Sequence, residues 1–250
     1  HISFERWLLE TVIRAEVLSQ LGLEKGDRVA FNLPNIPEQL YYTEAAKRLG
    51  IIYTPVFGGF SAKTLSDRIW DAGAKVVVTA DGGYRNAETI PYKESFTDVA
   101  LDNFIPLPTA LESLDAELAS FQMGDVGARL GSAVRAALEG EITVERSDVM
   151  RELGRALEAE ESITAEKKAD VRTAVARRLA DARHCVENVI VIKYTGQEVV
   201  VQSRDVWSHD LVAKASEAVV SKAKAAGFDV GAAEDILKLS DAEAWRALAA

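Results

Sequence analysis

Apolar residues near the start of the chain follow first a helical and then a strand-like spacing. Over residues 4–21 they recur every three or four positions, which predicts an amphipathic helix, and Gly22 suits the left-handed turn that ends one. Residues 28–33 then form a short apolar run that Pro34 closes, which is typical of a strand. The chain therefore begins with a helix followed by a strand.

The same alternation continues to residue 79. Helices are predicted over residues 37–50 and 61–73, each ending in glycine, and strands over residues 51–56 and 75–79, which are rich in β-branched residues. Nearly continuous apolar strands separated by helices are typical of a parallel sheet that is covered on both faces. The predicted fold class is α/β, a parallel sheet of repeated βα units.

The middle of the chain has a purely helical pattern. Its apolar stripes are Leu130, Val134 and Leu138, then Val149, Leu153 and Ala156, then Val171, Val175 and Leu179. We predict three or four antiparallel helices over residues 107–183, inserted as a bundle at the edge of the sheet. The α/β portion comprises residues 1–106 and 184–208, with a further strand at 189–192. Residues 209–250 form a helical extension that includes Trp245 and Leu248.

Composition narrows the function classes. Of 250 residues, 48% are hydrophobic and 27% are charged, as in ordinary globular proteins. A net charge of −10 argues against nucleic acid or an anionic membrane as the main partner. The single cysteine, Cys185, excludes a disulfide framework and multi-thiolate metal sites, and fits a reducing, cytoplasmic compartment. No apolar run reaches the roughly 18–20 residues of a bilayer span.

Candidate binding residues follow the predicted strands. Ligands of parallel sheets bind outside the carboxyl ends of the strands, where Phe57, Gly58, Gly59 and Arg85 are expected. The glycines lack two Cβ atoms that would keep a ligand from the backbone, Phe57 offers a flat apolar face, and Arg85 matches a phosphate. Paired glycines after a strand are most often plain turns, and exposed arginines are most often solvated, so these residues alone favour a purely structural interpretation over a ligand site.

A pair of carboxylates and the residue types that bind metals are further candidates for a functional site. Asp67 and Asp71 lie one turn apart on a predicted helix, flanked by Arg68 and Lys75. We interpret them as part of a charged outer face rather than as a catalytic pair. No spacing of histidine, cysteine or carboxylate residues indicates a metal site.

Several motifs in order along the chain resemble one known family. They are GLEKGDRVA (residues 22–30), LPNIPE (33–38), VFGGFS (56–61), DAGAKVV (71–77), TADGG (79–83), IPYK (90–93), VIVIKYTG (189–196) and RDVW (204–207). Together they resemble the acetyl-CoA synthetase group of AMP-forming acyl-CoA ligases, within the adenylate-forming ligase superfamily. Members form an acyl-adenylate from a carboxylate and ATP and then transfer the acyl group to the thiol of CoA.

The resemblance implies roles for the candidate residues. The α/β portion would be the CoA side of the ligase N-terminal domain, and Phe57, Gly58, Gly59 and Arg85 would bind the nucleotide end of CoA. A second basic residue of the family, three positions beyond the arginine, is replaced by Glu88 here. The implied substrates are CoA, ATP and a small carboxylic acid, with Mg²⁺ bound beside ATP by the rest of the ligase chain. No catalytic residue is expected in this sequence.

Two departures from the family pattern shape the remaining expectations. The phosphate loop of the family, similar to Gly-Lys-Pro-Lys-Gly, does not occur before Ala250, so the chain is expected to be an N-terminal fragment that is inactive alone. The helical stretch at 107–183 replaces a short connector. An enlarged ligase of this kind resembles the ligase part of multifunctional propionyl-CoA synthases, which activate 3-hydroxypropionate and carry fused hydratase and reductase domains. The alternative is a non-catalytic scaffold that uses a ligase-like fold to hold neighbouring modules.

Overall fold

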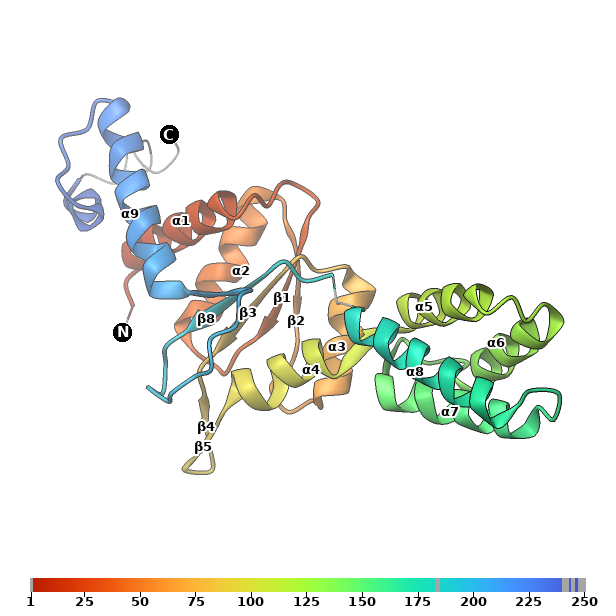
Figure 1. Ribbon diagram of the computed structural model, residues 1–250. Coiled ribbons are helices and arrows are strands. Elements are labelled where there is room, and N and C mark those ends of the chain that lie inside the picture. The colour runs from red at the N-terminus through yellow and green to blue at the C-terminus, as the bar shows by residue number, and fades with distance from the viewer. Residues whose placement is uncertain (1, 183–184, 240–242, 244–245, 247–250) are drawn as a thin grey trace. The chain divides into compact units, whose positions relative to one another are not determined.

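The chain folds into two compact units. A computed structural model describes residues 2–182, 185–239, 243 and 246 (Figure 1). The first unit combines His1–Phe60, Ala72–Glu94 and Val186–Ala250, and the second combines Ser61–Asp71 and Ser95–Cys185. The domain limits predicted from the sequence, at residues 106 and 183, differ from this division and stay predictions. Residue 183 lies outside the residues that the structure describes.

A five-stranded parallel sheet forms the centre of the first unit. Its strands are β1 (Arg28–Asn32), β2 (Ile52–Pro55), β3 (Val76–Ala80), β8 (Asn188–Ile192) and β9 (Asp205–Trp207). The order is β2-β1-β3-β8-β9, and every adjacent pair is parallel. The α/β prediction is therefore confirmed at the level of the parallel sheet. Because β2 and β3 lie on opposite sides of β1, their connections leave in opposite directions, which creates a crevice at the carboxyl ends of β1 and β3.

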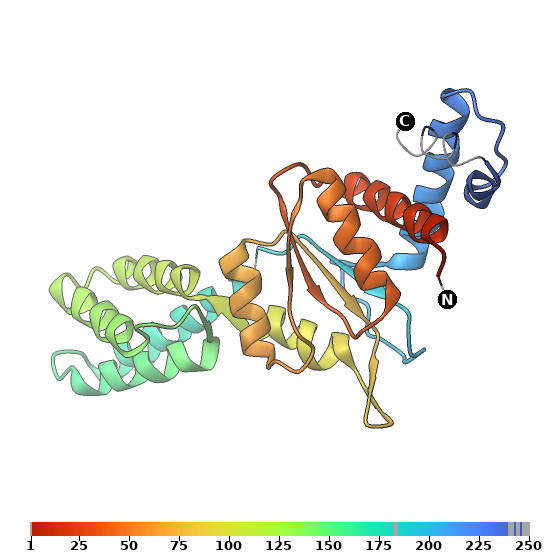
Figure 2. The same ribbon diagram turned by 180° about the vertical axis from the view of Figure 1, so that it is seen from behind.

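Three helices cover one face of this sheet. They are α1 (Phe4–Gln20), α2 (Pro37–Leu49) and α9 (Ser208–Ala225), and both views show them on the same side (Figures 1 and 2). They share one hydrophobic core with alternate strand residues, among them Phe31, Val78 and Ile190. The left-handed turn predicted at Gly22 after α1 is confirmed by its φ angle of 78°, and Gly50, the predicted end of the next helix, has a φ of 70°.

The remaining segments of the first unit are short. A hairpin of β4 (Gly83–Arg85) and β5 (Glu88–Ile90) follows β3, and a 3-10 helix at Ala233–Lys238 follows α9. The predicted helical extension is thus helical in part. Trp245 and Leu248, which were predicted to lie in it, are outside the described residues.

The second unit is mainly helical. Its elements are α3 (Ala62–Ala72, of which Ala72 belongs to the first unit), α4 (Val99–Asp102), α5 (Leu107–Ser120), α6 (Asp125–Ala137), α7 (Arg146–Ala159), α8 (Ala165–Asp181), β6 (Phe104–Pro106) and β7 (Thr143–Glu145). A π-helix at Lys93–Asp98 leads into α4. The antiparallel pairing of β6 with β7 was not predicted, because strands of three residues carry too few positions for a periodic signal.

Helices α5–α8 lie side by side around a core of their own (Figure 2). The predicted stripes supply this core: Leu130, Val134, Val149, Leu153, Val171, Val175 and Leu179 are all at most 2% exposed. The helical pattern is therefore confirmed, whereas its status as an insertion into the family fold stays a prediction. None of the described helices is both long and apolar enough to cross a bilayer.

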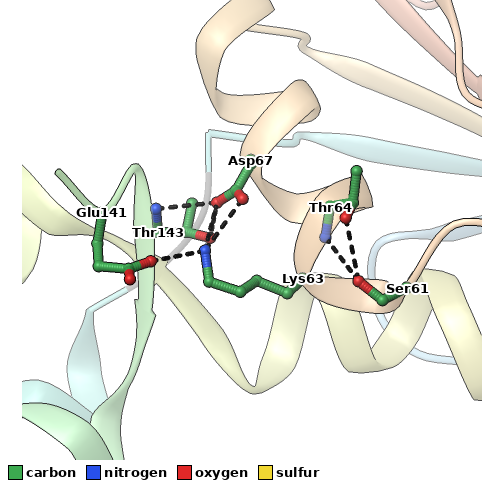
Figure 3. Close-up of polar contacts among 6 residues, drawn as sticks. All are labelled: Ser61, Lys63, Thr64, Asp67, Glu141 and Thr143. Atoms are coloured by element: carbon green, nitrogen blue, oxygen red, sulfur yellow. Dashed lines mark hydrogen bonds and ion pairs between the residues drawn. The ribbon is translucent and has the colours of Figure 1, made fainter.

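A polar cluster connects α3 to β7 within the second unit (Figure 3). The Asp67 carboxylate accepts hydrogen bonds from the backbone N–H and the hydroxyl of Thr143, at 3.0 and 2.5 Å. Lys63 forms ion pairs with both Asp67 and Glu141, at 3.0 and 2.9 Å. The interpretation of Asp67 as part of an outer charged face is therefore wrong: its carboxylate is the acceptor for a buried residue 76 positions away.

Replacing Asp67 should destabilise the second unit. In Asp67→Ala the fully buried Thr143 loses the acceptor for two donors, and we expect a loss of about 1–3 kcal/mol in the free energy of unfolding. Urea unfolding measures this loss. Asp71→Ala is the matched control because Asp71 is exposed on the same helix. Equal losses in the two variants would contradict the assigned role of Asp67.

Candidate functional site

A cavity of about 510 Å³ lies at the carboxyl ends of β1, β2, β3 and β8 in the first unit. It is lined by Leu33, Pro34, Asn35, Gln39, Pro55, Val56, Phe57, Gly58, Gly59, Tyr84, Arg85, Tyr92 and Tyr194. All four predicted site residues thus surround one cavity, although Phe57 and Arg85 come from different loops. The cavity lies at the crevice that the strand order creates, where open parallel sheets bind ligands.

The two side chains with the clearest binding chemistry are exposed to solvent. Phe57 follows β2, is 71% exposed and contacts Phe60 edge to face at 6.0 Å between ring centroids. Arg85 ends β4 and is also exposed. One lining residue therefore offers an apolar ring face, and another offers a guanidinium that can hold an anion.

The hairpin that carries Arg85 also carries an acidic residue. Asn86 and Ala87 form its two-residue turn, both with positive φ, which is the geometry that fits the twist of paired strands. This turn places Glu88 directly opposite Arg85 in the ladder. Side chains in such positions are close enough to interact, so the carboxylate lowers the positive potential around the guanidinium.

The paired glycines have a role that the sequence did not indicate. A Cβ atom on Gly58 would lie 2.2 Å from the hydroxyl of Tyr92, and one on Gly59 would lie 2.6 Å from the ring of Phe57. Aromatic side chains of the chain itself therefore fill the space that the missing Cβ atoms leave. Approach of a ligand to these two backbones stays a prediction.

Three tyrosines of the lining were missed by the sequence analysis. Tyr84 and Tyr194 contact each other edge to face, with ring centroids 5.7 Å apart. Burial raises the pKa of Tyr92, and the nearby charge of Arg85 offsets this only in part, so the phenol is protonated at neutral pH and can donate a hydrogen bond. Each tyrosine lies within or beside one of the motifs on which the family resemblance rests. This position is the feature of the sequence that could have identified the three tyrosines as site residues.

A buried carboxylate holds two of the cavity loops together. The side chain of Asp81, directly after β3, accepts four backbone N–H groups: Gly82, Tyr194 and Thr195 donate to Oδ1 at 2.7, 2.8 and 2.9 Å, and Gly196 donates to Oδ2 at 2.7 Å. Burial alone would raise the pKa of Asp81, but these donors outweigh it and the pKa is lowered. The ionised carboxylate thereby fixes the loop that carries Tyr194 to the end of β3.

A buried ion pair makes a second long-range connection. Lys93 is fully buried, and its ammonium lies 2.9 Å from the Asp205 carboxylate and donates to the carbonyl oxygen of Val200 at 2.9 Å. The same carboxylate accepts the backbone N–H of Gln202 at 2.6 Å. This pair joins the segment after β5 to the start of β9, and both residues lie in motifs of the resemblance that had no assigned role.

The side chains of the lining are suited to binding a ligand. It combines aromatic faces and one guanidinium, the groups that suit a ligand with a heterocycle and an anionic group. Among the described residues, no group of three or more histidine, cysteine or carboxylate side chains is arranged to hold a metal ion.

Neutralising Asp81 should loosen the cavity. Asp81→Asn leaves one carbonyl oxygen for four donors, so we expect a loss of roughly 2–4 kcal/mol in the free energy of unfolding at pH 7. Because the folded pKa is lowered, the carboxylate stabilises the fold fully above the ordinary aspartate pKa, about 3.9, and this stabilisation disappears as the pH falls through the folded value.

Urea unfolding between pH 2 and 7 measures the difference between the parent chain and Asp81→Asn. That difference should be constant near neutrality and shrink in acid. Asp229→Asn, at an exposed position, is the control for the loss of one charge. A difference that does not change with pH would contradict the role of the ionised carboxylate.

Comparisons with known proteins place these features in a family. Residues 2–196 match the family described as AMP-binding enzyme. The acetyl-coenzyme A synthetase of Gemmatimonas aurantiaca is 46% identical over 101 residues, which are 40% of this chain and 15% of that protein. The acetyl-coenzyme A synthetase of Alcanivorax borkumensis is 43% identical over 111 residues (44% and 17%), and that of Campylobacter jejuni serotype O:2 is 49% identical over 90 residues (36% and 13%).

The aligned part of the chain thus spans only 13–17% of the length of these relatives. The family match is far broader, because it extends over most of the chain and includes β1, β2, β3, β8 and every residue of the cavity lining. The chain belongs to the AMP-binding enzyme family.

Proposed function

We propose that this chain is the CoA-binding part of an AMP-forming acyl-CoA synthetase. Such a ligase converts a carboxylate, ATP and CoA into an acyl-CoA, AMP and pyrophosphate. The observation that carries the proposal is the position of Phe57 and Arg85 on one cavity at the carboxyl ends of the strands. Membership of the AMP-binding enzyme family and the acetyl-coenzyme A synthetases among the relatives support it.

The groups in the cavity fit the adenine ring and the phosphates of CoA. Adenine is a flat heterocycle, and the exposed ring of Phe57 can take it by stacking. The CoA phosphates are anions, and the guanidinium of Arg85 can hold one of them by charge-assisted hydrogen bonds. Because Gly58 and Gly59 lack side chains, the rings of Tyr92 and Phe57 can lie directly beside them. Glu88 weakens the hold of Arg85, because the two side chains face each other across the hairpin.

Within this proposal, the remaining substrates bind to the rest of the ligase. ATP with its Mg²⁺ and the small carboxylic acid are assigned there, because the phosphate loop of the family does not occur in this sequence. Acyl-adenylate formation is therefore independent of Arg85, whereas transfer of the acyl group to CoA depends on it. The single cysteine favours a cytoplasmic location.

A finer proposal concerns the acid that is activated. Helices α5–α8 form a separate core where the resemblance leads us to expect a short connector, and an enlarged ligase of this kind resembles the ligase part of propionyl-CoA synthases. The substrate would then be 3-hydroxypropionate, and fused hydratase and reductase domains would be partners. To test this assignment of the substrate, the rates of acyl-CoA formation from 3-hydroxypropionate and from acetate are compared in the ligase that contains this chain. A preference for acetate would refute the assignment.

Arg85→Ala should weaken CoA binding. Loss of a charge-assisted hydrogen bond of about 1.5–3 kcal/mol corresponds to a roughly ten- to hundred-fold higher dissociation constant. Titration calorimetry measures the dissociation constant for CoA. Glu88→Gln should shift it in the opposite direction, toward tighter binding. In the ligase that contains this chain, pyrophosphate exchange without CoA should remain unchanged.

The control for this experiment is Arg48→Ala, which removes an exposed arginine from the last turn of α2, at the other end of the strands. Unchanged CoA affinity in Arg85→Ala, or loss of pyrophosphate exchange with unchanged affinity, would refute the assignment of Arg85.

A further inference from the structure

Tyr92 lies between two glycines that belong to different segments of the chain, Gly58 in the loop after β2 and Gly83 at the start of β4. On one side, a Cβ atom on Gly58 would lie 2.2 Å from the hydroxyl and 2.7 Å from Cε1 of the ring. On the other side, a Cβ atom on Gly83 would lie 2.7 Å from Cε2. Real Cβ atoms do not approach side chains so closely, so the two edges of one ring occupy the space beside both glycines.

These two glycines lie within the two segments that carry the binding groups. Gly58 follows Phe57 in the loop after β2, and Gly83 begins β4, the strand that Arg85 ends. The ring of Tyr92 therefore lies between the segment with the aromatic face and the segment with the guanidinium. All of these residues except Gly83 line the cavity.

The backbone at Tyr92 is held from the next residue. Lys93 is fully buried, paired with Asp205 and bonded to the carbonyl oxygen of Val200. A buried lysine without its partner is strongly unfavourable, so this pair limits movement of the chain at that point. The ring of Tyr92 is thus attached to a fixed backbone and touches the two loops from there.

We propose that Tyr92 is a positioning residue that sets the separation between Phe57 and Arg85. It does so by packing against Gly58 and Gly83. Only a ligand that contacts both Phe57 and Arg85 at once is sensitive to this separation. CoA is such a ligand under the proposed function, on which this inference rests, whereas adenosine presents the heterocycle without a phosphate. Tyr92 therefore contributes to affinity for a nucleotide that carries phosphates and not to affinity for the nucleoside.

A double-mutant cycle tests the packing. Gly58→Ala should lower the unfolding temperature and weaken CoA binding about tenfold or more, because the added methyl group displaces the ring of Tyr92. In a Tyr92→Ala background the same substitution should have little further effect, since the ring is gone. Gly59→Ala is the matched control: its contact is with Phe57, so Tyr92→Ala should not relieve it.

Ligand binding separates positioning from a direct bond. Tyr92→Phe keeps the ring and should retain CoA affinity within about twofold, whereas Tyr92→Ala should lose about tenfold for CoA and leave adenosine binding unchanged. Calorimetry measures CoA binding, and ligand-observed NMR measures adenosine binding. Loss of CoA affinity in Tyr92→Phe would overturn the inference in favour of a direct hydrogen bond from the phenol.

The two proposals fail in distinguishable ways. Additive effects of Gly58→Ala and Tyr92→Ala on the unfolding temperature, which is measured without ligand, would overturn the positioning role whether or not CoA binds. Coupled effects in a chain that does not bind CoA would instead refute the proposed function and leave Tyr92 as the residue that spaces the two loops.

Discussion

The cavity of this protein depends on a carboxylate that has been removed from water. Asp81 is 1% exposed, and such a group is stable in the ionised form only if hydrogen-bond donors replace its hydration. Four backbone N–H groups do so, three of them from a loop more than 110 residues further along the chain. The need to satisfy one charge therefore determines where the loop after β8 lies, and with it one wall of the cavity.

The other walls follow from packing around glycine. The ring of Tyr92 fits beside Gly58 and Gly83 because neither has a side chain, and the ring of Phe57 fits beside Gly59 in the same way. The hairpin turn at Asn86 and Ala87 then places Arg85 at the rim. A parallel sheet thus supplies the location, and two kinds of contact, the hydrogen bonds to Asp81 and the packing of aromatic rings beside glycines, determine how the loops lie.

The sequence was informative wherever structure is determined locally. Strands β1, β2, β3 and β8 and the helices around them were predicted because apolar spacing and terminal glycines act within a few residues. Phe57 and Arg85 could be named because they follow strands. Asp81, Tyr92 and the Lys93–Asp205 pair could not be assigned, since their partners are distant in sequence and no spacing rule connects them. Asp67 was misread for the same reason: its partner, Thr143, lies 76 positions away.

The most direct test of this account is amide hydrogen exchange of the chain with and without CoA. We expect slower exchange in the loops after β1, β2 and β8 and in the β4–β5 hairpin, with α5–α8 unchanged, because the ligand contacts only the cavity. Exchange that is unaffected by CoA, or slowed only in segments outside the cavity lining, would contradict the claim that these loops form a binding site for the coenzyme.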